Sequence, residues 1–209
     1  MRFSFQISLC LLLLGFSSNL SAQVDSRKCT IKSLIGDVNI RRGTAVNWVD
    51  ARPNMPLREN DAIRTLIESE ILLETSEGTS LKVGENSTIE MAVFSAKGET
   101  QNTKIKILSG SLVSTVKKRL TIQSRFEFET PTATAAMSGA VLSFHVSNEG
   151  TLIKVYEGSV LVTSERLKSS VLLKENQMVS IKKSQKDITI QKLEENNEHQ
   201  SIKTNNTEK

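Results

Sequence analysis

The stretch TPTATAAMSGAVLSFHV, residues 130–146, can be interpreted as a helix or as a strand, and the choice between them decides the fold class. Alanine has the highest intrinsic helix propensity, so a short helix over Ala133–Ser138 is one of them. The rest of the chain, however, alternates apolar and polar residues as strands do. We therefore predict a tightly packed central strand, in which tertiary packing overrides helix propensity, and keep the helix as the alternative.

The residues at the two ends of this stretch indicate where the strand begins and ends. Thr130 and Pro131 are expected to end the preceding strand, because proline cannot donate a ladder hydrogen bond. Gly139 is expected to mark a bulge or corner before a second strand over residues 141–146. Between these ends the side chains alternate between two faces, with Ala133, Ala135 and Met137 on one and Thr134 and Ala136 on the other. Small side chains on both faces would let another layer approach closely.

Period-two alternation continues along most of the chain and predicts a single all-β domain over residues 28–183. Ser69–Thr75 and Thr79–Val83 flank a Glu-Gly turn and predict a β-hairpin. Further alternating segments lie at residues 104–108, 121–128, 152–156, 160–163 and 179–181. The pattern predicts short antiparallel strands, arranged either as a β-sandwich or as a rolled, solenoid-like sheet.

One motif recurs three times in the form I-K-x-x-x-G-[DS]-[VL], at residues 31–38, 105–112 and 153–160. Each copy predicts a strand, a Gly-Asp or Gly-Ser turn and a second strand. The structural glycines are Gly36, Gly110 and Gly158, and we expect them at backbone corners with positive φ or close packing. The uneven spacing of the copies indicates a recurring supersecondary unit and not a strict solenoid period.

The two ends of the chain differ in composition from its centre. Arg2, the apolar run at residues 7–16 and the small residues up to Ala22 are typical of a secretory signal peptide, residues 1–22. We predict cleavage after Ala22 and export to the periplasm or beyond. Cys10 lies inside the apolar run, so we interpret it as a hydrophobic residue and not as a lipoprotein cysteine. Residues 191–209 are polar and predict a disordered tail.

Charge and cysteine content narrow the range of partners. Removing residues 1–22 leaves 187 residues with 26 basic and 23 acidic side chains, and the signs are interleaved. A nucleic-acid binder usually carries a clustered basic stripe with aromatics, whereas the longest basic run here is Lys117–Arg119. We therefore expect no nucleic-acid partner. Cys29 is the one cysteine left after cleavage, so no internal disulfide is expected, and a partly buried thiol is favoured over pairing with another molecule.

Several short motifs follow one another in an order that resembles the FecR-domain family of bacterial envelope proteins. The resemblance covers roughly residues 34–180. The motifs lie at residues 36–43, 55–65, 69–73 with 77–81 and 87–89, 108–112, 126–140 and 155–162. The most distinctive is residues 126–140, which is similar to the family pattern F.V.TP.A.A.V.GT. The family commonly has Arg-Gly-Thr where this chain has Ser138-Gly139-Ala140, and a late glycine where it has Asn176.

The resemblance implies an exported binding module without catalysis. Relatives with the full regulatory architecture relay iron-siderophore signals through a membrane helix and a cytoplasmic anti-sigma segment, and we recognise neither segment here. We therefore do not expect a complete transmembrane regulator. The candidate binding or structural motif comprises Thr130, Pro131, Ser138, Gly139 and Ala140. If the family's Arg and Thr serve a ligand, that role is in doubt here.

Few residues are candidates for catalysis or metal binding. Glu127 and Glu129 share a strand face as a glycosidase pair could, but such pairs are usually solvated. His145 fits a half-exposed strand histidine better than a catalytic base. One cysteine and two distant histidines cannot form a zinc site. We therefore predict no catalytic residue, no metal and no cofactor.

Three functions stay open at this point. The first is an envelope module that binds a protein or a small ligand, as the resemblance implies. The second is a structural protein that binds cell-wall glycan, and the third, less favoured, is an unrecognised hydrolase. Trp48, with Arg41 and Arg42 nearby, is a candidate contact for a sugar or a peptide, although a lone tryptophan more often anchors a core.

Overall fold

The protein is described by a computed structural model that covers residues 28–97, 100–116, 124–184 and 186–193. All regular elements in these residues are strands. The predicted signal peptide, residues 1–22, and the predicted tail from residue 194 onward lie outside the described residues. The described part contains no helix with the length and apolar character that crossing a membrane requires.

The strands form two layers, which we call sheet A and sheet B. Sheet A contains, in spatial order, β4 (Pro56–Leu57), β1 (Cys29–Ile35), β6 (Glu70–Thr75), β7 (Ser80–Val83), the second half of β9 (Thr100–Val116), β12 (Ala140–Val146), the first half of β13 (Gly150–Ser164), β15 (Gln177–Lys182) and β16 (Ile190–Lys192). Sheet B contains β3 (Trp48–Asp50), β2 (Val38–Arg41), β5 (Ala62–Thr65), β8 (Thr88–Lys97), the first half of β9, β10 (Arg125–Glu129), β11 (Thr134–Met137), the second half of β13 and β14 (Ser169–Lys174).

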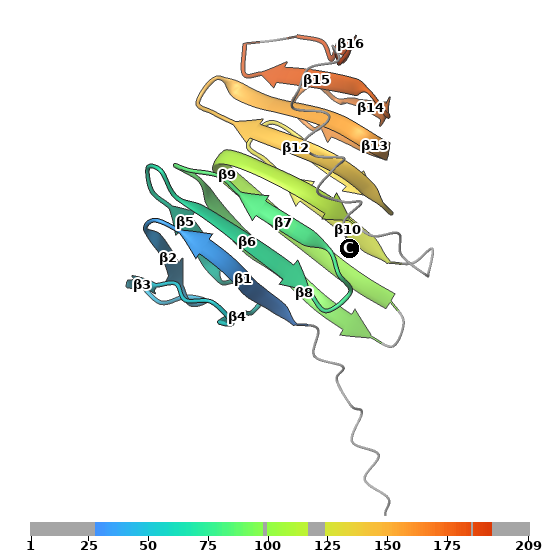
Figure 1. Cartoon of the computed structure of the whole chain (residues 1–209). Coiled ribbons are helices and arrows are strands. Elements are labelled where there is room, and N and C mark those ends of the chain that lie inside the picture. Colours follow the sequence, from blue (N-terminus) through green and yellow to red (C-terminus); the bar gives the residue numbers. More distant parts are fainter. Residues whose placement is uncertain (1–27, 98–99, 117–123, 185, 194–209) are drawn as a thin grey trace, which may run out of the picture.

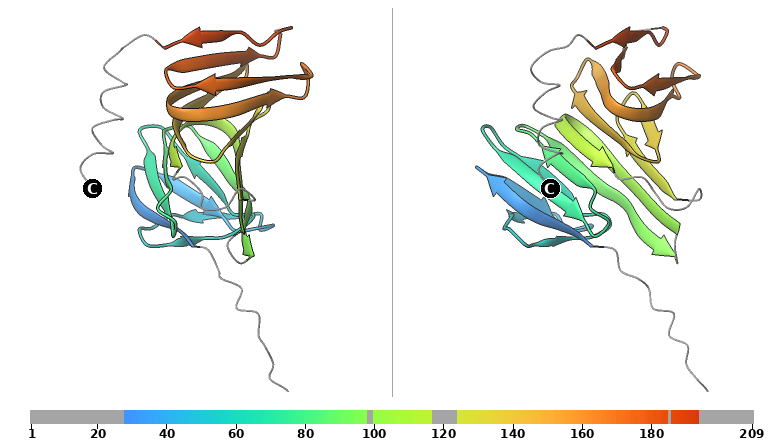
Figure 2. Two further views of the ribbon diagram at one scale, coloured as in Figure 1. Left: turned by 90° about the vertical axis from the view of Figure 1, so that its right-hand side faces the viewer. Right: turned by 45° about the vertical axis from the view of Figure 1, so that its right-hand side comes forward.

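Each layer follows the order of the chain almost without interruption. The early strands lie at one end of the molecule and the last strands at the other (Figures 1 and 2). The fold therefore combines the two predicted alternatives, with two sheet layers as in a sandwich and a chain that advances along them as in a solenoid. The all-β prediction is confirmed. Two details differ from it, since β9 and β13 are long, with 17 and 15 residues, and β9 pairs with β10 in parallel.

The three repeated motifs are the places where the chain passes from one layer to the other. Gly36, Gly110 and Gly158 have φ angles of 71°, 94° and 84°. Gly36 separates β1 of sheet A from β2 of sheet B, as the predicted strand-turn-strand unit requires. Gly110 and Gly158 instead lie inside β9 and β13, where the strand bends and continues. The prediction of a turn with a separate second strand is therefore wrong for those two copies, because the bend keeps its ladder partners on both sides.

The stretch that opened the analysis folds as a strand. β11 pairs with β10 on one side and β13 on the other, so it is a central strand of sheet B. Ala135 and Met137 are buried, while Thr134 and Ala136 are half-buried, which matches the predicted alternation. The helix alternative is wrong. The Ala135 and Met137 face packs into the core between the layers, whereas the Thr134 and Ala136 face remains partly open to solvent.

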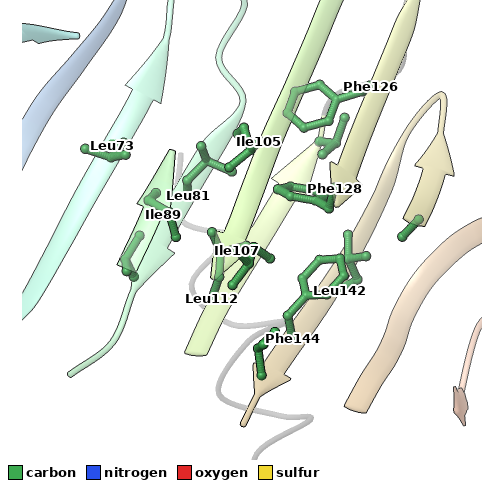
Figure 3. Close-up of a cluster of buried hydrophobic side chains, with 14 of the residues drawn as sticks. Leu73, Leu81, Ile89, Ile105, Ile107, Leu112, Phe126, Phe128, Leu142 and Phe144 are labelled. Atoms are coloured by element: carbon green, nitrogen blue, oxygen red, sulfur yellow. The ribbon is translucent and has the colours of Figure 1, made fainter. Parts of the chain in front are cut away.

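The core fills the space between the inner faces of the two sheets (Figure 3). Phe128 of β10 and Phe144 of β12 connect the layers, with ring centroids 4.8 Å apart and planes tilted by 52°. Phe126 adds a second aromatic contact to Phe128 at 5.2 Å. Each buried phenylalanine contributes about 1.5–3 kcal/mol through removal of apolar area from water. This cluster therefore holds the two sheets together near the middle of the molecule.

The end of the body lies further along the chain than predicted. Gln191 and Lys192, assigned above to the polar tail, belong to β16, which pairs with β15. The N–H of Leu193 also donates to the carbonyl of Asn176 at 2.9 Å. The composition of this segment gave no sign of a strand because all three β16 residues are exposed, so backbone pairing holds it without a buried side chain.

Candidate functional site

Thr130 and Pro131 form a turn whose polar groups bond inside the protein. The Thr130 N–H donates to the Ala133 carbonyl at 2.8 Å, and the Ala133 N–H donates to Thr130 Oγ1 at 3.1 Å. Thr132 Oγ1 donates to Thr151 Oγ1 at 2.8 Å, which donates to Thr130 Oγ1 at 2.9 Å. Ser164 Oγ donates to the Thr132 carbonyl at 2.9 Å. The turn thus ties together the two ends of β13, and its hydroxyl groups are used for structure.

The second part of the candidate motif lies elsewhere. Ser138 is exposed, Gly139 is half-buried and Ala140 is buried at the start of β12. Ala140 is the partner of Gly158, whereas the Thr130 turn contacts Thr151. These two β13 positions are seven residues apart, which corresponds to roughly 20 Å along a strand. The structure therefore places the two parts of the motif at opposite edges of the sandwich and does not join them in one site.

An open depression of about 500 Å³ is found on another part of sheet B. Its lining residues are Val93, Thr100, Asn102, Thr103, Lys104, Arg125 and Glu127. None of the candidate motif residues lines it. Asn176, which replaces the late family glycine, has a φ of 60°. Asparagine accepts this left-handed conformation better than most residues, so this departure preserves the backbone.

The three residues considered for a hydrolase do not lie on one face of the molecule. Lys104 Nζ lies 3.4 Å from Glu127 Oε2 and 3.6 Å from Glu129 Oε2, so both carboxylates share one ammonium on the outer face of sheet B. His145 is exposed on the outer face of sheet A, between Ser111 and Leu152 of the neighbouring strands. Packed sheets are about 10 Å apart, and the core fills that space. The carboxylates and the imidazole therefore cannot act on one substrate bond.

Asp61 is a buried acidic residue near the first strands, and its side chain has several internal partners. Its side chain is 4% exposed and forms an ion pair with Arg42. Asp61 also accepts from the N–H of Gly43 at 3.1 Å and from the N–H of Arg58 at 3.0 Å. Charge-assisted bonds of this kind fix a loop firmly. Arg42, one of the two arginines proposed beside Trp48, is therefore engaged in holding this loop.

The actual neighbours of Trp48 are Arg41 and Arg64. The guanidinium carbon of Arg64 lies 4.7 Å from the indole centroid and that of Arg41 lies 5.6 Å from it, both within cation–π range. Arg64 Nη2 also donates to Asn39 Oδ1 at 3.1 Å. All three residues of this stack are half-buried. Sequence analysis found Arg41 and Trp48 but missed Arg64, because β5 reaches β3 only across β2.

The structure also shows where Cys29 lies and whether potential metal ligands are grouped. Cys29 is fully buried at the start of β1, which agrees with a structural thiol. In the ranges that the structure describes, no three His, Cys, Asp or Glu side chains are grouped to hold a metal ion.

Part of this chain matches a known protein family. A family model described as FecR protein matches residues 61–161, from the buried Asp61 to β13. The resemblance stated above is thereby confirmed, and this part of the chain is a FecR domain.

Solved structures show the same fold. Two crystal structures of a proposed anti-sigma factor from Parabacteroides distasonis ATCC 8503 resemble it with TM-scores of 0.54 and 0.53 and sequence identities of 13% and 15%. Each match covers 64% of this chain and 60% of that one, so this chain spans less than two thirds of their length. At this identity the likeness shows the fold alone. No curated protein sequence matches the chain.

Proposed function

We propose that this chain is an exported, non-catalytic FecR-domain module that binds a partner protein in the bacterial envelope and takes part in signalling. The observation that carries the proposal is the FecR match over residues 61–161. The fold likeness to a protein described as a proposed anti-sigma factor supports the signalling part of the proposal.

The geometry favours binding over the two alternatives. Glu127 and Glu129 both lie beside Lys104, and His145 lies on the outer face of the other sheet, which gives a hydrolase less support than binding. A sugar platform requires an accessible aromatic face, and the Trp48 ring already contacts two guanidinium groups. The protein-binding role therefore has more support than catalysis or glycan binding.

The export part of the proposal has a direct test. Expressed in a Gram-negative host, the chain should lose residues 1–22 on the way to the periplasm, and N-terminal sequencing of the recovered protein should begin at Gln23. A chain recovered from the cytoplasm with Met1 still attached to Ala22 would contradict this part.

The binding part is tested with the mature chain, residues 23–209, as tagged bait. We expect saturable retention of a defined protein from envelope extracts of the native host. We also expect no sedimentation of the chain with purified cell wall in parallel. Sedimentation with wall material and no retained protein would contradict the proposal in favour of the glycan alternative.

A further inference from the structure

Two guanidinium groups on sheet B have no carboxylate partner. Arg41 of β2 and Arg64 of β5 form no ion pair with any residue that the structure describes. The Nε atoms of both are buried and have no hydrogen-bond partner. Arg42, the next residue along the chain, is instead held by Asp61 and the Pro56 carbonyl. Among the arginines that the structure describes, only Arg41 and Arg64 have a buried Nε without a hydrogen-bond partner.

Contacts within the stack hold the side chains of Arg41 and Arg64 in position, but no carboxylate in the described part of the chain neutralises their positive charge. Trp48 contacts each guanidinium carbon within 5.6 Å, and Asn39 accepts from Arg64, so neither arginine swings as an exposed side chain would. Two like charges held against the same indole ring repel one another, and buried N–H donors without acceptors are costly. A carboxylate bound at the half-buried guanidinium groups would offset their like charge and would require little further ordering of the side chains.

The surroundings of the stack define which anion fits. A guanidinium presents its donors in a planar fork that matches a carboxylate. Asp50 accepts from Asn39 at 3.3 Å beside the stack, and Glu90 pairs with Ala62, the strand partner of Arg41. These two acids limit the local positive charge, which suits one or two carboxylates better than a polyanion. β3 pairs with β2 alone among the described strands, so an extended segment can reach the stack from that side.

We propose that Arg41, Trp48 and Arg64 form a recognition site for carboxylate side chains of an acidic segment in a partner protein. This inference rests on the proposed function and assigns the binding surface that it needs. The partner segment places an aspartate or glutamate against the guanidinium forks, while the indole keeps the two arginines in position.

The single tryptophan of the chain reports on this site directly. Trp48 fluorescence is titrated with a dodecapeptide of alternating Glu and Ser and with the matched peptide of alternating Gln and Ser. We expect a saturable change with the glutamate peptide and at least tenfold weaker binding of the glutamine peptide. R41Q and R64Q should each weaken binding of the glutamate peptide about tenfold.

R125Q is the matched control, because Arg125 is an exposed arginine in β10 of the same sheet. Its affinity should stay within twofold of the unchanged protein. If a glutamine variant fails to fold by circular dichroism, R41K and R64K take its place. Lysine keeps the positive charge but lacks the planar pair of N–H donors that a guanidinium offers to a carboxylate. These variants should therefore weaken binding at least threefold.

Equal affinity for the two peptides, or equal loss in R125Q, would overturn the inference. So would a response to inorganic phosphate or to phosphatidylglycerol vesicles that exceeds the response to the glutamate peptide. The R41Q/R64Q double variant separates the two proposals in the envelope pull-down. Loss of the retained protein supports the site. If the double variant retains that protein unchanged, the site is wrong and the proposed function stands, whereas peptide binding with no retained protein counts against the proposed function.

Discussion

At Gly110 the backbone adopts a φ of 94°, and a Cβ built there would lie 2.1 Å from Ser87 Oγ and 2.4 Å from Ser87 Cα. The Ser111 N–H donates to the same Ser87 oxygen at 2.9 Å, so the serine cannot move away without losing a bond. The corner of β9 therefore needs glycine for two reasons, the left-handed conformation and the close contact. This residue sets the crossing of β9 from sheet B to sheet A.

Gly110→Ala should lower the free energy of unfolding by about 2–4 kcal/mol, because backbone strain and overpacking add together. Gly43→Ala is the matched control, since Gly43 also has positive φ, at 45°, but nothing lies within 4 Å of its added Cβ. That control should cost about 1 kcal/mol from strain alone. Urea unfolding measures both, and an alanine at 110 that costs no more than one at 43 would refute this account of the corner.

At the scale of elements, the Thr130–Ala133 turn depends on its hydroxyl chain. Thr151→Val removes the acceptor of Thr132 and the donor to Thr130 in a site that is 2% exposed at residue 151. We expect a loss of about 1–3 kcal/mol in unfolding free energy, because a buried hydroxyl is left without its partner. Thr163→Val on the same strand breaks only an exposed bond to Ser170 and should change stability by less than about 0.5 kcal/mol. Similar losses in the two variants would argue against the hydroxyl chain as the anchor of the turn.

Local patterns predicted the elements better than their pairing. Alternation identified β6, β7 and β13, and the repeated glycines identified the corners. Each of these patterns is carried by residues that are close together in the sequence. The parallel pairing of β9 with β10 and the stacking of Arg64 on Trp48 depend on which strands become neighbours. That depends on contacts between residues far apart in the chain, and no local spacing records it. For the same reason the sequence suggested one motif at residues 130–140 where the structure has two separated ends of a strand.

At the scale of the whole molecule, β9 and β13 each belong to both layers, and one core cluster runs from Cys29 to Ile181. Repeat arrays can unfold in parts because each unit contacts only its neighbours. Shared strands and a continuous core should instead give one cooperative transition. Trp48 reports on the β3 end, whereas far-UV circular dichroism reports on all strands, and we expect the two urea midpoints to coincide. A tryptophan transition at clearly lower urea would show that the first strands unfold separately.

The central claim is that one strand enters both sheets by bending at Gly110, and inter-strand backbone NOEs test it most directly. The account predicts contacts of Lys106 with Glu129 of β10 and of Val113 with Ser143 of β12 in the same molecule, which are the registers on either side of the bend. If residues 100–116 show contacts to the same neighbouring strands along their whole length, β9 stays in one sheet and the account is contradicted.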